Sequence, residues 1–407
     1  MGRLPDPVFI ASVALGAAMF SAIYWLFGFL RMGTTGLTAQ AFGALSESNQ
    51  GELVAIFIRA SAIAAVLGLS MVLLQIPLTQ LLFLLFDPPG DVGRLAAEYY
   101  QIRIWGAPAY LIYIVELGIL FGLQKMRATL YLSVGLNVSN LALDLLLVLG
   151  FNMDVRGVAL GTVISEWGAA VFGFAFVWHA LTPYRQSPLQ NLWQRSKVTQ
   201  LLDVSANLIL RTFFVQLPFL AGTILATGLG TLPLAAHAIL MQLFFVMTYA
   251  LDGFAHTVET LAGYYYGAKD PKNLRAACIY STLWAAGLAF LISAMLFLFG
   301  HNLVDMFTVA EEVRQYAYEY LPWLASVPIF CVWAFLLDGI FIGTTHIREM
   351  RNAMLFSAVL WGLLLWLTFP SYEYHAVWFS MNCFMLLRGL LLGLSYPRIE
   401  QAAKVAV

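Results

Sequence analysis

The residues best placed to do chemistry lie in the apolar stretch 132–150. Four polar side chains, Ser133, Asn137, Asn140 and Asp144, recur there at spacings of four, three and four residues. At about 100° per residue this spacing places all four along one side of a helix. A carboxyl group in hydrocarbon costs roughly 3 kcal/mol or more, and such groups normally face a bundle interior or a water-filled cavity. Asp144 is therefore the first candidate for a working group, and the alternative is a carboxyl that only holds helices together.

The composition identifies the kind of protein that contains this stretch. Of 407 residues, 61% are hydrophobic and 11% are charged, whereas soluble proteins carry about 25% charged residues. Eleven apolar runs are long enough to cross roughly 30 Å of hydrocarbon. We expect an all-α polytopic membrane protein whose spans are 9–31, 53–83, 99–122, 129–150, 157–178, 202–225, 232–258, 277–300, 321–343, 354–369 and 376–393.

The distribution of basic residues predicts the orientation of the chain. Twelve Lys and Arg residues lie in alternate loops and the C-terminal tail, against four in the intervening loops. This positive-inside bias predicts a cytoplasmic C-terminus in the inner membrane. Eleven spans would then place Met1 outside. The basic residues of the cytoplasmic set are Lys125, Arg127, Arg185, Arg195, Lys197, Lys269, Lys272, Arg275, Arg348, Arg351, Arg398 and Lys404.

Glycine patterns indicate an internal repeat. The pair Gly43-Ala44 recurs as Gly267-Ala268, and the motif Gly118-x-x-x-Gly122 recurs as Gly339-x-x-x-Gly343, at offsets of 224 and 221. Because six spans separate the copies, we expect two parallel, pseudo-symmetric helical lobes. The predicted lobes are residues 1–181 and 198–407, with 182–197 as a cytoplasmic linker.

The repeat also predicts twelve spans, of which eleven are present. The second half has the span 202–225 before its Gly-Ala span, while the first half has only seven residues there. A twelfth helix at the front would also return the N-terminus to the cytoplasm. We expect that the first helix is missing, either because the start codon is misplaced or because the chain is truncated.

Several charged residues of the first half lie inside predicted spans. Thr162 and Glu166 lie one turn apart in the span after Asp144, and Glu166 is a possible partner for the polar seam. Arg31 and Arg103 are expected to extend towards a membrane interface. Glu116 lies deeper, as either a structural partner or part of a pathway.

The second half carries more charge. Asp252 and Glu259 lie on one face of the seventh span, Asp338 lies in the ninth and Arg211 in the sixth. Arg211 needs a carboxylate partner in lipid, and its loss is expected to leave that carboxylate unpaired at a cost of roughly 3–5 kcal/mol. These residues form either a structural ion-pair cluster or a cation or proton site.

Several motifs that mark ATP-driven motors and enzymes are absent from the sequence, and this limits the classes of function that the sequence predicts. The sequence contains no GxxxxGK[ST], HExxH or GxSxG motif, so it predicts neither an ATP motor nor an enzyme, and transport must draw on an ion gradient. Cys278, Cys331 and Cys383 are isolated. Their spacing suggests no metal site, disulfide framework or cofactor.

Three runs resemble a known family. LRMGTTGLTAQAFGA (30–44), YALDGFAHTVE (249–259) and LLDGIFIGTTHIREMRN (336–352) are similar to the DinF-like branch of the multidrug and toxic compound extrusion (MATE) transporters. The resemblance covers nearly the whole chain. It implies two six-helix lobes around a central cavity and export of organic cations against inflow of H⁺ or Na⁺.

The resemblance also implies site residues. The N-lobe cation site of such transporters is matched here by Asn140, Asp144 and Thr162, and the polar seam adds Asn137. The fourth member of that site is an aspartate on the first helix, which this chain lacks. In the C-lobe, Asp338 matches a family carboxylate.

The sequence therefore predicts a secondary antiporter that exports amphipathic or cationic compounds by alternating access, with H⁺ favoured over Na⁺ as the coupling ion. The alternatives are a flippase for lipid-linked precursors and an inactive truncated transporter. The expected partners are the bilayer, small substrates and the coupling ion. We expect a monomer that binds no nucleic acid.

Overall fold

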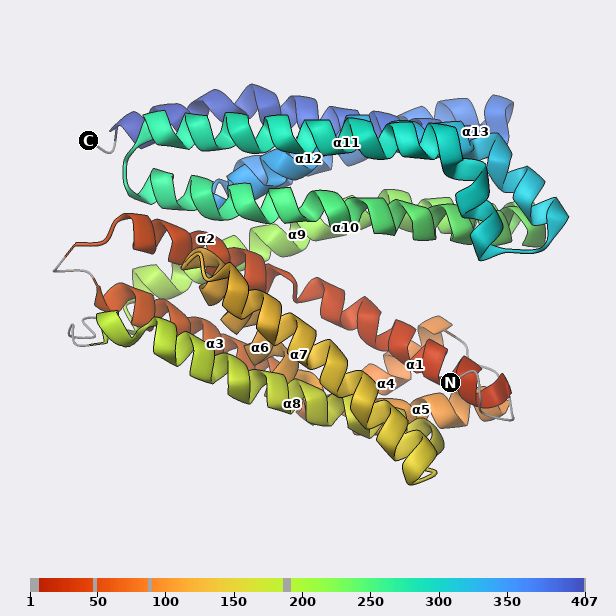
Figure 1. Ribbon diagram of the computed structural model, residues 1–407, viewed down its shortest axis with the longest axis horizontal. Coiled ribbons are helices and arrows are strands. Elements are labelled where there is room, and N and C mark those ends of the chain that lie inside the picture. Colours follow the sequence, from red (N-terminus) through yellow and green to blue (C-terminus); the bar gives the residue numbers. More distant parts are fainter. Residues whose placement is uncertain (1–6, 47–49, 87–89, 186–191, 406–407) are drawn as a thin grey trace. The chain divides into compact units, whose positions relative to one another are not determined.

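The computed structural model describes residues 7–46, 50–86, 90–185 and 192–405, and this part of the chain is helical throughout, with no strand (Figure 1). Short 3-10 turns lie at Ile104–Gly106 and Thr182–Tyr184, and a π turn lies at Leu146–Gly150. The α-helices are α1 (Pro7–Leu26), α2 (Phe29–Gly43), α3 (Gly51–Leu73), α4 (Gln75–Phe86), α5 (Gly90–Arg103), α6 (Ala107–Gly122), α7 (Met126–Leu145), α8 (Asp154–Ala180), α9 (Arg195–Leu229), α10 (Thr231–Gly267), α11 (Pro271–Phe307), α12 (Glu311–Gly343) and α13 (Ile347–Val405).

The helices agree with the predicted spans. Ten stretches of the described residues are long and apolar enough to cross a membrane. The last of them, Ile347–Lys404, has 58 residues, about 87 Å of helix, which is far more than one crossing needs. It breaks at Glu373, whose φ of 45° and ψ of −121° are not helical. The break makes two crossings, so the described residues contain the eleven spans that the sequence predicts.

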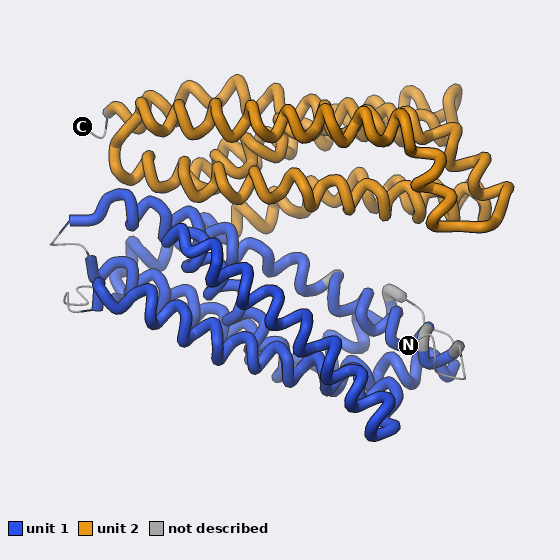
Figure 2. The backbone as a smooth tube through the Cα atoms, viewed as in Figure 1, with its two compact units in different colours: residues 1–205 blue, residues 206–407 orange. Residues whose placement is uncertain are grey.

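The chain forms two compact units, residues 1–205 and 206–407 (Figure 2). The division falls inside α9, whereas the predicted linker 182–197 precedes it and includes residues outside the described ranges. In unit 1, α6 packs against α2, α3 and α8, and α7 packs against α8. In unit 2, α12 packs against α10, α11 and α13.

Equivalent glycines in the two units allow two helices to approach each other closely, as the predicted repeat requires. In unit 1, a Cβ on Gly122 would lie 2.5 Å from the Cβ of Thr38, so α6 approaches α2 closely. In unit 2, a Cβ on Gly343 would lie 2.0 Å from the carbonyl oxygen of Glu259, so α12 approaches α10 in the same way. Each GxxxG motif therefore serves close packing between backbones.

The C-terminal ends of α6 and α12 have the same hydrogen-bonding pattern. The backbone N–H of Lys125 donates to the carbonyl of Leu120 at 2.8 Å, and that of His346 donates to Phe341 at 3.0 Å. The residue before each donor is left-handed, with φ of 59° at Gln124 and 55° at Thr345. This bonding satisfies the carbonyls that a helix C-terminus leaves free. The offset of 221 found in the sequence thus holds for the helix caps.

We expect Gly343→Ala to lower the melting temperature of the detergent-purified protein. Alanine normally favours a helix over glycine by about 1 kcal/mol, but here its methyl would overlap the α10 backbone, and overpacking costs about 1–3 kcal/mol. Gly362→Ala in α13 is the matched control, because a Cβ there meets no atom within 4 Å. Equal melting temperatures for the two variants would contradict the close approach of α12 and α10.

Candidate functional site

The polar seam of the sequence lies at the C-terminal end of α7. Asp144 is half-buried in the last turn of α7, and the π turn Leu146–Gly150 begins two residues later. Helix α7 packs along α8 (Figure 1). Single π turns within helices occur frequently at functional sites. Asp144 is therefore positioned where the helix backbone departs from regular α geometry.

Two of the four seam residues, Asn140 and Asp144, come together with Thr162 of α8. The side-chain amide of Asn140 donates to the Thr162 hydroxyl at 3.1 Å and to Asp144 Oδ1 at 3.5 Å. Thr162 in turn donates to the carbonyl of Val158 at 2.9 Å. The result is a carboxylate–amide–hydroxyl chain across two helices, with Asn140 as its centre.

Asn137 is not part of this chain. It is exposed, and its amide donates to the backbone carbonyl of Ser133 at 2.8 Å. Gly161 is a site residue that the sequence reasoning missed. A Cβ at Gly161 would lie 2.5 Å from Asp144 Oδ1, so only glycine leaves room for the carboxylate against α8. The sequence could have indicated Gly161, because it directly precedes Thr162.

A second charged group lies on α8 one turn beyond Thr162. Arg103 and Glu166 form a two-pronged ion pair with both N–O distances at 2.5 Å. The Arg103 guanidinium also lies 5.0 Å from the centre of the Phe20 ring and 5.3 Å from that of Tyr24. The expectation that Arg103 extends to an interface is wrong. Its desolvation is offset by a bidentate carboxylate and two aromatic faces.

Glu116 is fully buried in α6. Neither of its carboxyl oxygens makes a hydrogen bond to any described residue. Helix α8 touches it through Gly173, where a Cβ would lie 2.0 Å from Oε2. A carboxylate this deep without a counter-charge would be very unfavourable. Of the two alternatives for Glu116, the structure shows no structural partner among the described residues.

Unit 2 contains a buried cluster that joins three helices. Asp338 on α12 accepts hydrogen bonds at Oδ2 from Arg211 on α9 and, at 2.6 Å, from Arg388 on α13. Arg388 is 1% exposed and lies over the ring of Phe384 at 5.4 Å. We name Arg211, Asp338 and Arg388 the arginine–aspartate cluster. It holds one negative charge between two positive ones.

The other two carboxylates that the sequence offered to Arg211 lie on α10. Glu259 is buried, and its Oε2 lies 3.3 Å from Nδ1 of His256. Asp252 is half-buried two turns earlier on the same helix. Of the three carboxylates that the sequence offered to Arg211, the structure pairs it with Asp338. Among the described residues, no group of three or more His, Cys, Asp or Glu side chains could hold a metal ion.

Comparison with known proteins decides the family. The family model described as MatE matches residues 1–146 and 208–367, which is most of the chain. The chain belongs to the MATE family. It is 38% identical to DNA damage-inducible protein F of Escherichia coli over 404 residues, covering 98% of this chain and 86% of that protein. The DinF-like resemblance is thereby confirmed.

More distant MATE relatives extend the comparison. The chain is 25% identical to Protein DETOXIFICATION 44, chloroplastic, of Arabidopsis thaliana, over 74% of this chain and 57% of that one. It is 21% identical to the multidrug export protein MepA of Staphylococcus aureus, over 78% and 69%. The protein is thus a multi-pass membrane transporter of the MATE family and not an enzyme.

Solved structures agree with the fold. A crystal structure of MATE in the bent conformation has a TM-score of 0.89 at 18% identity, covering 98% of this chain and 89% of that one. A MOP superfamily transporter from Pyrococcus furiosus has a TM-score of 0.87 at 19% identity, with the same shares. The all-α polytopic fold predicted from the sequence is confirmed.

Proposed function

We propose that this MATE transporter is a secondary antiporter that exports amphipathic, mostly cationic organic compounds in exchange for H⁺ by alternating access. The observation that carries the proposal is the half-buried Asp144 carboxylate, tied through Asn140 to Thr162 on the next helix. An ionisable group inside a membrane span is by default a functional candidate. This one is linked to a contact between two helices.

The geometry suggests how a proton would act. A hydrogen bond to an ionised carboxylate is roughly twice as strong as one between neutral groups. Protonation of Asp144 would weaken its bond from Asn140 and so loosen the chain that connects α7 to α8. Because the π turn begins two residues after Asp144, the end of α7 is a place where such a change can be absorbed. Proton binding and helix packing would then be coupled.

The hydrogen-bond directions favour H⁺ over Na⁺. Asn140 presents its amide nitrogen to both Asp144 and Thr162. A donor in the centre of the site suits a carboxyl that exchanges a proton. A hard cation instead needs several converging oxygens. In the arrangement seen here, the Asn140 amide would have to rotate before it could serve as a ligand.

Relatives support the substrate class. MepA is named a multidrug export protein, and the Arabidopsis relatives are named DETOXIFICATION proteins. We extend export of varied organic compounds to this chain from those names. The inner membrane is the proposed location, with the C-terminus in the cytoplasm according to the positive-inside pattern. Activity of a C-terminal alkaline phosphatase fusion, which requires the periplasm, would contradict that orientation.

One observation favours a second function. The buried arginine–aspartate cluster carries one more positive than negative charge, and this excess would favour an anion in unit 2 electrostatically. The Pyrococcus furiosus transporter with the same fold is described as having a binding pocket of reverse polarity that suggests a different function. A flippase for lipid-linked precursors is therefore the alternative.

The two functions are separated by transport in proteoliposomes that contain the purified protein. We expect an imposed pH gradient, but not a Na⁺ gradient, to drive movement of tetraphenylphosphonium, a lipophilic cation. Liposomes with the gradient collapsed by a protonophore are the control. Na⁺-driven movement would overturn the choice of ion. Movement of a fluorescent lipid-linked sugar without cation transport would favour the flippase.

A further inference from the structure

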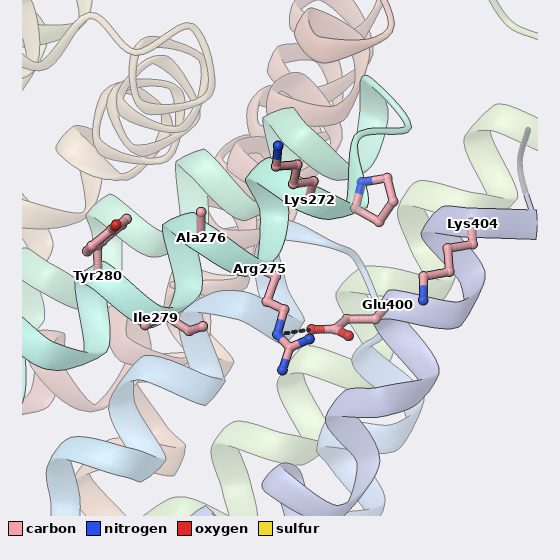
Figure 3. Close-up of a pocket in the computed structure, with 8 residues that line it drawn as sticks. Lys272, Arg275, Ala276, Ile279, Tyr280, Glu400 and Lys404 are labelled. Atoms are coloured by element: carbon pink, nitrogen blue, oxygen red, sulfur yellow. Dashed lines mark ion pairs between the residues drawn. The ribbon is translucent and has the colours of Figure 1, made fainter.

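A groove lies at the ends of two spans of unit 2 (Figure 3). It is formed by the first turns of α11 and the last turn of α13, and has a volume of about 510 Å³. Pro271 is the first residue of one apolar span, and Lys404 is the last residue of another. The predicted spans 277–300 and 376–393 end within these two helices, and the groove lies at and just beyond those ends, on the side of the membrane–water interface. We name it the basic groove; its main lining residues are Lys272, Arg275, Ile279, Tyr280, Glu400 and Lys404.

The basic groove carries a net positive charge. Among the residues that line it, Lys272 and Arg275 from α11 and Lys404 from α13 are opposed by Glu400, which leaves two positive charges in the lining (Figure 3). The Arg275 Nε–Glu400 Oε1 distance is 3.8 Å, too long for a hydrogen bond. The exposed guanidinium therefore keeps its donors available for a ligand.

The start of α11 lies beside the basic groove. A helix N-terminus carries a partial positive charge and favours anions. Asp270 caps the helix by accepting the Asn273 backbone N–H at 3.0 Å, and that bond holds the pKa of the Asp270 carboxyl below its usual range. The Asp270 carboxylate therefore already occupies the anion position at this helix end, so the attraction of the basic groove for a ligand anion comes from the side chains of Lys272, Arg275 and Lys404.

An apolar stripe leads away from the basic groove along α11. Its members recur at helical spacing and are between 47% and 70% exposed, so they face lipid. From Ile279 to Leu291 the stripe is about 18 Å long, comparable with one leaflet of a hydrocarbon core of roughly 30 Å. Two of its residues line the groove itself. The stripe consists of Ile279, Tyr280, Leu283, Trp284, Phe290 and Leu291.

We propose that the basic groove binds the phosphate headgroup of an anionic phospholipid, whose acyl chain lies along the α11 stripe. Basic pockets between spans are a known mode of acidic lipid recognition. A soluble phosphate would use the cations but not the stripe. A zwitterionic lipid would use the stripe but would not compensate the charge. Only a ligand with both an anionic headgroup and an acyl chain matches the basic groove and the apolar stripe beside it.

The test measures phosphatidylglycerol binding to the full-length protein in detergent by native mass spectrometry. We expect Lys272→Gln with Arg275→Gln to weaken binding about tenfold or more, since each basic residue contributes substantially to binding an anionic lipid surface. Glu400→Gln removes the opposing charge and should tighten binding. The matched control is Lys125→Gln with Arg127→Gln in unit 1, which removes two exposed cations outside the groove.

Each result of the binding measurement either supports or rejects the lipid site. Equal weakening by the control pair would mean that surface charge alone attracts the lipid, and the site would be rejected. Equal affinity for phosphatidylcholine would reject the role of the phosphate charge. Displacement of the lipid by millimolar inorganic phosphate would indicate a soluble anion site and reject the lipid. Because Lys272, Arg275, Lys125 and Arg127 are exposed, unchanged melting temperatures without lipid are expected for both double variants. The melting temperature of Glu400→Gln is compared separately, since Glu400 is half-buried.

Discussion

Asp338→Asn is expected to destabilise unit 2 by about 3–5 kcal/mol. The substitution removes the single negative charge of the arginine–aspartate cluster and leaves Arg211 and Arg388 buried beside each other without compensation. Like charges at that distance repel, and each guanidinium has already lost its hydration. The expected result is a large fall in the melting temperature of the detergent-purified protein.

The same geometry revises the effect of losing Arg211. The sequence suggested that Arg211→Ala would leave a buried carboxylate unpaired. The structure shows that Asp338 also binds Arg388, so the carboxylate keeps a partner. Arg211→Ala should therefore cost clearly less than Asp338→Asn. The order of the two melting temperatures tests whether all three residues form one cluster.

Two further variants complete this test. Glu312→Gln removes an exposed carboxylate at the start of α12 and should leave the melting temperature unchanged. Replacing Arg211, Asp338 and Arg388 together by Met, Leu and Met should recover much of the lost stability, because an apolar set of similar volume can replace a buried ion cluster. A melting temperature of Asp338→Asn equal to wild type would contradict burial of the cluster.

The spans and the repeat were predictable because the bilayer imposes simple constraints. A crossing needs about 20 apolar residues whatever its neighbours are, so hydropathy alone finds all eleven. Close backbone packing requires small residues, and this is why Gly122 and Gly343 mark equivalent contacts. The polar seam around Asp144 could be recognised in the sequence for a related reason. Polar side chains in an otherwise apolar helix stand out at helical spacing.

Pairing between distant residues could not be read from the sequence. Position along a span says how deep a charge lies but not which neighbour it faces. Arg103 lies near the start of its predicted span, which favoured an interface, yet it pairs with Glu166 on another helix. Arg388 was missed altogether, although an arginine inside the predicted span 376–393 was a usable signal. Gly161 became meaningful only once α7 and α8 were seen in contact.

Asp144→Asn is expected to abolish proton-driven efflux while leaving the protein folded. Asparagine has nearly the shape of a protonated aspartate and can still accept the Asn140 amide hydrogen bond, but it cannot release a proton. The coupling step would therefore be fixed in its neutral state. The measurement is pH-driven movement of tetraphenylphosphonium in proteoliposomes, with melting temperature and reconstitution yield compared with wild type.

Two alanine variants on α8 make this prediction specific to the Asp144 site. Gly161→Ala places a methyl 2.5 Å from Asp144 Oδ1, so the oxygen that accepts the Asn140 hydrogen bond must shift, and efflux should fall although Asp144 remains ionisable. Gly168→Ala, in the same helix, meets no atom within 4 Å and should transport normally. Full transport by Asp144→Asn at normal yield would show that the proton is carried elsewhere. Because Gly161→Ala keeps every titratable group, its loss of efflux alone would show that the position of the carboxylate, and not only its charge, couples the proton to transport.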